Sequence, residues 1–358
     1  MARRTRALEG VEGERGRTMR ILLTGIDGYI GTVLGQELFK EGHEVVGLGT
    51  GYFRDAWFYE MPNFQNPKII KKDIRDVKKE DVEGFDAIVH LAELSNDPLG
   101  ENDPKITYDI NHNGTVRLAA FAKEAGVSRF IYFSSCSVYG ASDEIVDETS
   151  PTNPLTAYAK SKEMNEEYLQ KLADDSFSPI ILRNATVYGA SPRFRFDLVV
   201  NNLAGLAFTT NEIKMDSDGT PWRPLVHVLD VCQAVRIALK NPREKTHNQI
   251  VNVGDTNSNY QIKDIAEIIK NTFPGCTVSL NKNSSDKRNY RVNFEKIKTV
   301  LPGFSCRYDV AKGARELKEI FEKIKMTKEV FMDKAYTRLK KIEYLRKTNQ
   351  IDEKFFWR

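Results

Sequence analysis

Residues that bind metals or form disulfides are scarce in this sequence. Its 358 residues include only four cysteines and five histidines. The cysteines (Cys136, Cys232, Cys276 and Cys306) lie far apart and no two of them have the spacing of metal ligands, so we expect no metal site. Few, scattered cysteines are typical of a reducing compartment, so we expect a cytoplasmic protein.

Long apolar runs and a charge excess are also missing. No apolar run is long enough to span a membrane, and we expect no membrane partner. The 53 Lys and Arg residues exceed the 50 Asp and Glu residues by three, and this net charge of +3 is too small to indicate a nucleic-acid partner. Residues 1–18 contain five arginines but no apolar core, which excludes a secretory signal, and three glutamates there disfavour a transit peptide. We expect a disordered extension.

Short apolar runs alternate with segments of helical periodicity from Met19 onward. The runs are "MRILLTG", "HEVVGL", "KIIKKD", "DAIVHLA", "RFIYFSS" and "PIILRNATVYG". This alternation predicts an α/β protein with a Rossmann-type, doubly wound parallel sheet and helices on both faces. We expect residues 19–190 to form this domain, with 225–255 returning to it. We expect residues 191–224 and 256–358 to form a smaller α/β substrate-binding domain and C-terminal helices.

The segment "TGIDGYIG" follows the first apolar run and opens the first helix. Its glycines are three residues apart, as required where a tight turn brings the backbone close to a pyrophosphate and a helix N-terminus binds the phosphate. The segment therefore predicts a dinucleotide site. We expect this site to be lined by Gly25, Asp27, Gly28, Tyr29, Ile30 and Gly31.

The second strand carries no clear signal for the choice between NAD and NADP. An acidic residue that binds the adenosine ribose is expected at its end, but Gly49 stands there and Arg54 follows. We expect NAD, with NADP as the alternative. In "DIRD", Asp73 and Ile74 close the third strand, where Asp73 either accepts from the adenine amino group or lies in an exposed turn.

Tyr158 and Lys162 in "YAKSK" are four residues apart, which places them on one face of the expected helix. A lysine ammonium near a phenol favours the phenolate and lowers the pKa of the tyrosine, which makes the tyrosine a usable base near neutral pH. Such pairs are also common on helix surfaces, so this interpretation depends on the other motifs.

These motifs, with "HLAE", "NHNGT", "SSCSVYG", "LRNATVYG" and "RPLVHVLD", occur in the order of a known family. From residue 19 to about 300 the chain resembles the extended short-chain dehydrogenase/reductase family, and within it the UDP-galactose 4-epimerase-like nucleotide-sugar enzymes. The resemblance implies that Tyr158 transfers the proton and that Ser135 orients the substrate. It implies that Lys162 assists Tyr158 and binds the nicotinamide ribose. Further cofactor contacts are implied for Leu91, Ala92 and Asn111.

The family also implies a partner and a substrate class. We expect a homodimer through helices near residues 104–126 and 155–174, and a nucleotide-diphosphate sugar as the substrate. On the substrate side, the resemblance places Arg223 and Asn202 at the diphosphate. It further implies substrate contacts for Ser137 and Arg288, with Arg291 as the alternative to Arg288.

The residues after Ser135 narrow the chemistry. Related sugar 4,6-dehydratases carry Asp and then Glu where this chain has Cys136 and Ser137, and GDP-mannose 3,5-epimerases carry a cysteine base at the position of Ser137. We interpret Cys136 as a small buried hydrophobe. The remaining set favours oxidation and re-reduction of a sugar hydroxyl at C4. The alternative is a net NAD(P)-dependent dehydrogenase or 4-keto reductase. A Rossmann protein without turnover is disfavoured, because both Tyr158 and Lys162 are present.

Two positions depart from the family pattern. Thr186 stands where Asn is usual before "VYG", and Glu93 stands where "HLAA" would have Ala. Both departures leave the identity of the sugar open, and the sequence carries no signal for the nucleotide base.

Overall fold

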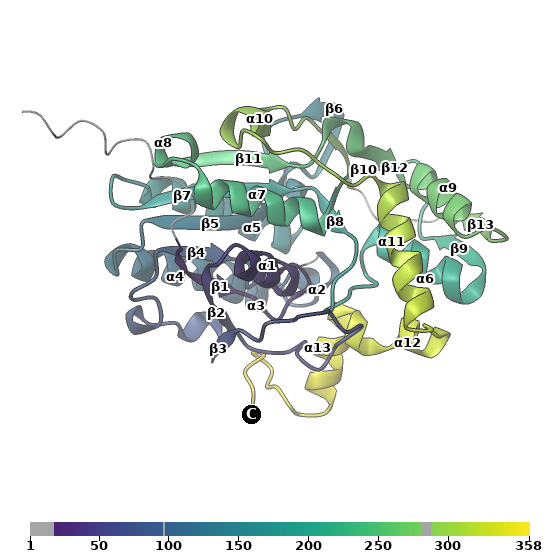
Figure 1. The fold of residues 1–358 in the computed structure, drawn as a ribbon, viewed down its shortest axis with the longest axis horizontal. Helices are drawn as coiled ribbons and strands as arrows, with labels where there is room; N and C mark the ends of the chain where they lie inside the picture. The colour runs from purple at the N-terminus through teal and green to yellow at the C-terminus, as the bar shows by residue number, and fades with distance from the viewer. Residues whose placement is uncertain (1–17, 96, 281–287) are drawn as a thin grey trace, which may run out of the picture.

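The computed structural model describes residues 18–95, 97–280 and 288–358, so the predicted extension lies almost wholly outside the described residues. Its centre is a seven-stranded parallel sheet with the order β11–β7–β5–β4–β1–β2–β3 (Figure 1). The strand order reverses between β1 and β4, which confirms the predicted doubly wound, Rossmann-type fold. The strands are β1 (Arg20–Thr24), β2 (Glu44–Gly49), β3 (Lys68–Lys71), β4 (Ala87–His90), β5 (Arg129–Ser135), β7 (Ser178–Asn184) and β11 (Gln249–Val253).

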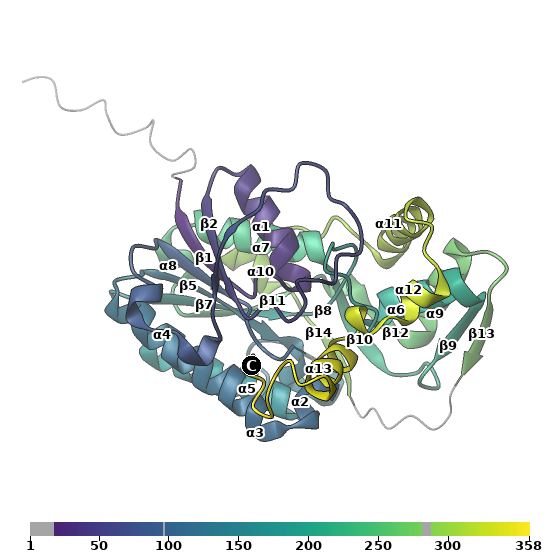
Figure 2. The same cartoon turned by 90° about the horizontal axis from the view of Figure 1, so that it is seen from below.

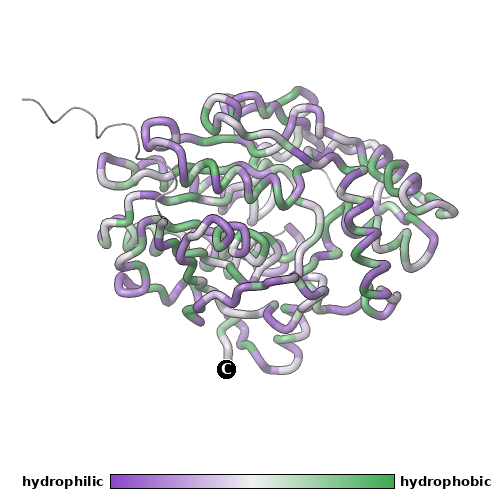
Figure 3. Tube along the Cα trace, in the orientation of Figure 1, coloured by the Kyte–Doolittle hydropathy of each residue, from purple (hydrophilic) through white to green (hydrophobic). Residues whose placement is uncertain are grey.

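Helices cover both faces of this sheet (Figure 2). On one face lie α1 (Tyr29–Lys40) and α7 (Val228–Lys240), and on the other lie α4 (Gly114–Glu124) and α5 (Ala157–Leu172). Successive strand residues therefore enter different cores, and Ile21 and Leu23 pack with α1 while Leu22 packs with α4. Burial on both faces explains why the strands are apolar runs without alternation, as the colouring of the central strands in Figure 3 indicates.

A second, smaller region adjoins the carboxyl ends of the strands (Figure 1). It joins the large sheet through a three-stranded sheet of β8 (Thr186–Tyr188), β10 (Trp222–His227) and β12 (Asn259–Gln261). Its core is aromatic and includes Phe194 and Phe196, and Phe58 from the loop after β2 stacks on Phe194 with ring centroids 4.5 Å apart. Its other main elements are α6 (Val199–Thr210), β9 (Glu212–Met215), α9 (Ile262–Thr272), β13 (Thr277–Leu280), α11 (Val310–Lys323) and α12 (Lys328–Met332).

The shorter elements complete the connections. Two parallel strands pair beside the second region, β6 (Ala141–Val146) and β14 (Asn289–Val292). The short helices are α2 (Asp97–Asn102), α3 (Pro104–Thr107), a π-helix (Tyr108–Asn113), α8 (Arg243–Thr246) and α10 (Lys296–Val300). Within the described ranges, no helix has the length and apolar composition needed to cross a bilayer.

The end of the chain returns to the large sheet. Helix α13 (Arg338–Lys347) inserts Ile342 and Leu345 into the core that contains Leu22 of β1. Phe355 joins the same core. The predicted C-terminal helices within residues 256–358 thus include α13, which packs against the dinucleotide side of the molecule.

Candidate active site

One large cavity lies where the carboxyl ends of the parallel strands meet the second region, and its volume is about 670 Å³. This is the position at which open α/β sheets bind ligands. All but one of the predicted site residues line it, namely Gly25, Asp27, Gly28, Tyr29, Ile30, Gly31, Asp73, Ile74, Leu91, Ala92, Ser135, Ser137, Tyr158, Lys162, Asn202, Arg223 and Arg288.

Asn111 is the predicted residue that does not line the cavity. Its side chain is buried behind the wall, where Nδ2 donates to the carbonyl of Leu94 at 3.1 Å and Oδ1 accepts from the Leu94 N–H at 2.8 Å. Asn111 therefore positions the loop after β4 rather than facing the cavity.

The glycine turn has the geometry that a dinucleotide requires. Gly25 has a φ of +72° and its N–H donates to the carbonyl of Leu48 at 2.7 Å. A Cβ on Gly31 would lie 2.2 Å from the Gly25 carbonyl oxygen, so only glycine lets α1 approach the turn this closely. Gly28 precedes α1 without a side-chain cap, which leaves the first N–H groups of the helix available for a phosphate.

The end of β2 lacks an acid, as the sequence indicated, but a carboxylate is nearby. Asp27 Oδ2 lies 3.9 Å from where a Cβ on Gly49 would be, and it pairs with the Arg54 guanidinium at 3.0 Å. Asp73, the other acid of this region, accepts from Arg75 Nε and Nη2, each at 2.9 Å. Both oxygens of Asp73 are thus already engaged by a guanidinium.

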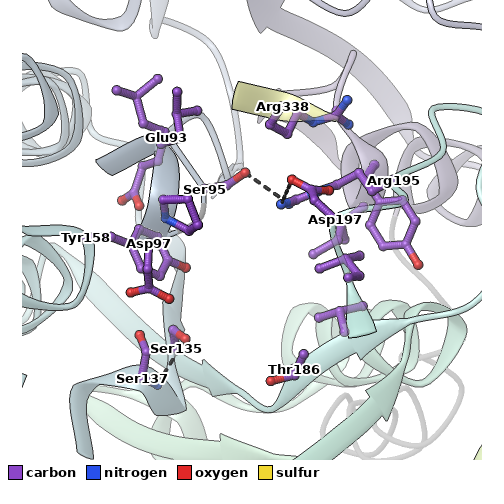
Figure 4. Close-up of a pocket in the computed structure, with 18 of the residues that line it drawn as sticks. Glu93, Ser95, Asp97, Ser135, Ser137, Tyr158, Thr186, Arg195, Asp197 and Arg338 are labelled. Carbon is purple, nitrogen blue, oxygen red and sulfur yellow. Dashed lines mark hydrogen bonds and ion pairs between the residues drawn. The ribbon is translucent and has the colours of Figure 1, made fainter. Parts of the chain in front are cut away.

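The three predicted catalytic residues come together at the ends of β5 and α5. Ser135 ends β5, and it lies on the same wall of the cavity as Tyr158. Lys162 lies one turn further along α5, with its Nζ 5.5 Å from the centre of the Tyr158 ring. Figure 4 shows Ser135, Ser137 and Tyr158 on one side of the cavity, facing Thr186 on the other.

Glu93 occupies a position between these groups that sequence analysis did not foresee. Its buried carboxylate forms an ion pair with Lys162 and accepts from the Tyr132 hydroxyl at 2.8 Å. The Lys162 ammonium also donates to the Phe133 carbonyl. The departure from "HLAA" was visible in the sequence, but its partner lies 69 positions away and no local pattern connects the two.

The charges in this cluster change the expected pKa of the tyrosine. Burial raises the pKa of Tyr158 well above its usual value, the negative charges of Glu93 and Asp97 raise it further, and the nearby Ser135 hydroxyl opposes them. Burial also lowers the pKa of the Lys162 ammonium, although Glu93 opposes that change. Burial and these two carboxylates therefore act against the lowered tyrosine pKa that the spacing of Tyr158 and Lys162 led us to expect.

Cys136 points away from the cavity. It is 1% exposed, and its Sγ donates to the Arg183 carbonyl at 3.3 Å. Burial raises the pKa of the thiol far above its usual value. The thiol is therefore a buried hydrophobe without nucleophilic character, as interpreted from the sequence.

Charged residues of the second region and of α13 form the opposite wall. Arg195 holds Asp197 through two bonds of 2.9 and 3.0 Å and donates to Ser95 Oγ at 3.2 Å (Figure 4). Arg338 lies beside this pair. This wall was not predicted, because the short segment "RFRFD" gives no indication of which way its side chains point.

The residues predicted to contact the substrate also line the cavity. Arg223 donates to the carbonyls of Trp222 at 2.8 Å and Arg288 at 2.6 Å. Arg288 forms an ion pair with Asp97. Asn202 donates to the Phe196 carbonyl at 3.0 Å. All three predicted residues are thus on the wall, with contacts to the protein itself.

This fold and this site define a dinucleotide-dependent enzyme of the short-chain type, with a serine and a tyrosine hydroxyl on the cavity wall. The family model "NAD dependent epimerase/dehydratase family" matches residues 21–254, and the chain belongs to that family. NAD is its cofactor, and the free N-terminus of α1 and the close glycine turn fit that group.

Comparisons with known proteins agree with this assignment. The chain is 30% identical over 275 residues to the UDP-glucose 4-epimerase of Lactobacillus helveticus, covering 70% of this chain and 81% of that relative. Among solved structures it is similar to TunA, an NAD-dependent NDP-hexosamine 5,6-dehydratase, with 25% identity, a TM-score of 0.75 and coverage of 86% and 98%. It is also similar to MoeE5 in complex with UDP-glucuronic acid and NAD, with 25% identity, a TM-score of 0.73 and coverage of 85% and 99%.

Proposed function

We propose that the protein is a nucleotide-sugar 4-epimerase. The single observation that carries this proposal is the placement of Ser135 and Tyr158 together on one wall of the cavity, without an acid at position 136 or 137. Such a pair is sufficient for moving a proton on and off a sugar hydroxyl. Elimination of water needs additional acids, which the neighbouring positions lack.

The chain's own residues have distinct roles in this proposal. NAD, when bound, accepts a hydride from the sugar carbon and later returns it. Tyr158 Oη takes the proton of the C4 hydroxyl during oxidation and gives it back during reduction, while the Ser135 hydroxyl orients the same oxygen. The Lys162 ammonium favours the phenolate form of Tyr158 electrostatically.

The cavity also accounts for the two ligands. The N–H groups that begin α1 at Tyr29 and Ile30 are suited to the dinucleotide phosphates. Arg223 and Arg288 are suited to the nucleotide-sugar diphosphate, because a guanidinium fork matches phosphate oxygens. The sugar lies between Tyr158 and Thr186 in this proposal.

The test compares Tyr158→Phe with Tyr168→Phe, a change on the same helix outside the cavity lining. Each protein is incubated with UDP-, dTDP-, GDP- and CDP-sugars, and the sugar product is identified by mass and chromatography. Tyr158→Phe is expected to retain NAD and to lose interconversion at C4, whereas Tyr168→Phe retains both. Undiminished turnover by Tyr158→Phe contradicts the proposal. If the unmodified protein releases one NADH for each sugar converted, it is a net dehydrogenase instead.

We also propose a homodimer that assembles through α4 and α5 and resides in the cytoplasm. Met164 on α5 is 38% exposed and lies on the outer face of this helix pair, which supports an interface there. All four cysteines are free, which fits a reducing compartment. Light scattering is expected to give twice the chain mass, and Met164→Glu is expected to reduce it. A monomer in the unmodified protein contradicts the dimer.

A further inference from the structure

Arg338 brings a buried positive charge from the far end of the sequence into the cavity wall. It is the first residue of α13, is 2% exposed and lines the cavity. Its Nη2 donates to the Arg193 carbonyl at 3.3 Å, and its guanidinium carbon lies 4.0 Å above the Phe53 ring. Its Nη1 has no hydrogen-bond partner among the described residues.

Within the part of the chain that the structure describes, no carboxylate forms an ion pair with Arg338, and Asp197 compensates its charge only in part. Asp197 is the acid that acts on it, but both oxygens of Asp197 pair with Arg195. Burial and the repulsion from Arg195 together lower the pKa of Arg338 to about 9. A buried guanidinium in this situation is costly unless an anion completes the site.

The start of α1 is a phosphate-binding feature of the cavity that Arg338 lines. Arg338 lines the same cavity as Gly28 and Tyr29, where the helix end that receives the dinucleotide phosphates opens. A guanidinium with a free edge matches the oxygens of a diphosphate better than a single ammonium does.

We propose that Arg338 binds the diphosphate of NAD, so that the C-terminal segment 338–358 is part of the dinucleotide site. This residue lies outside the family match at 21–254. The inference depends on NAD binding and not on the proposed 4-epimerase activity.

The rest of the segment holds the adenosine end of the same cavity. Trp357 Nε1 donates to the Thr50 carbonyl at 2.7 Å, and the Tyr52 hydroxyl donates to the Phe355 carbonyl. Thr50 and Tyr52 follow β2 and line the cavity. The guanidinium of Arg75 lies 3.8 Å above the Phe356 ring. These contacts fix the loop after β2, so the tail is a positioning element that slows the departure of the adenosine half.

The experiment measures equilibrium binding of NAD, ADP, adenosine and UDP to the full chain. Arg338→Met is compared with Lys340→Met, which removes the same charge from an exposed position on the same helix. Arg338→Met is expected to weaken NAD and ADP about ten- to a hundred-fold, as expected for losing a charge-assisted contact, and to leave adenosine and UDP unchanged within about two-fold. Arg338→Lys, which keeps the charge but not the fork, is expected to recover part of the loss.

Two results overturn this assignment. Unchanged NAD affinity in Arg338→Met shows that the guanidinium does not contact the cofactor. A loss of UDP affinity in place of NAD affinity shows that the anion is the nucleotide-sugar diphosphate. The positioning role of the tail is tested separately with Trp357→Ala, which is expected to speed NAD dissociation about ten-fold without changing the relative affinities for ADP and adenosine. An unaltered dissociation rate rules out that role.

Discussion

Replacing Glu93 by Gln tests how the catalytic cluster sets the pKa of Tyr158. The substitution keeps the shape of the side chain and removes the negative charge that pairs with Lys162. Two effects should then lower the pKa of Tyr158. The phenolate no longer faces the carboxylate of Glu93, and it experiences the lysine charge without compensation.

The distance between the groups gives the size of the change. At 5.5 Å from the ring centre, the charge of Lys162 stabilises a phenolate by about 3 kcal/mol for an effective dielectric constant of about 20. That energy corresponds to about 2 pKa units. Glu93 now offsets most of it, so we expect its removal to lower the pKa of Tyr158 by about 1 to 2 units.

The assay is a pH titration of the ultraviolet tyrosinate band, recorded as the difference from a matched protein that also carries Tyr158→Phe. Glu167→Gln is the control, because Glu167 lies on the same helix, is exposed and pairs only loosely with Lys171 at 3.6 Å. The pH at which hydride transfer begins should fall in parallel, since the phenolate is the base. A titration midpoint that stays in place or rises refutes the reasoning, and a rise means that Lys162 has lost its proton without Glu93.

Three further changes test other parts of the structure. Asp27→Ser is expected to raise the affinity for NADP relative to NAD at least about ten-fold in binding titrations, because it frees Arg54 for a 2′-phosphate; an unchanged ratio contradicts this. Burial lowers the pKa of His90 to about 3, so below pH ~6.5 the unfolded state takes up a proton that the folded state excludes, and the free energy of unfolding falls on acidification by up to about 1.4 kcal/mol per pH unit. Denaturant unfolding measured between pH 4 and about 6.5 should show a free energy of unfolding that depends less steeply on pH in His90→Asn than in the unmodified protein. Gly31→Ala should abolish NAD binding and lower Tm, because its Cβ would meet the Gly25 carbonyl oxygen at 2.2 Å, whereas Gly35→Ala, with its nearest atom at 3.6 Å, should do neither.

Much of the fold follows from local sequence patterns. Strands of a parallel sheet are buried on both faces, so "RILLT" and "RFIYFSS" are recognisable as apolar runs, and the glycine triplet marks the turn between β1 and α1. Tyr158 and Lys162 could be placed on one helix face by their spacing alone. These features depend on neighbours within a few positions, which sequence analysis reads well.

The rest of the site depends on contacts between distant segments. Glu93 reaches Lys162 from the end of another strand, and together with burial it raises the pKa of Tyr158, against the change that the pair alone would give. Arg338 enters the cavity from α13. Its helical periodicity predicted a C-terminal helix but not that this helix lines the site. Asn111 belongs to a motif that suggested a cofactor contact, but its side-chain amide forms hydrogen bonds with the backbone of Leu94. Motif matches locate a residue in the site without revealing what its side chain touches.

The bond between Trp357 and Thr50 joins positions 307 residues apart. During synthesis the segment around Thr50 leaves the ribosome early, and its partner follows only after the whole large sheet has been made. Contacts of such long sequence separation form late, because the entropy of ordering the intervening chain must first be compensated by other contacts. The loop after β2 therefore reaches its final conformation only after the segment around Trp357 has been made, and the nascent chain passes through a stage in which the sheet strands are present while this loop is still free.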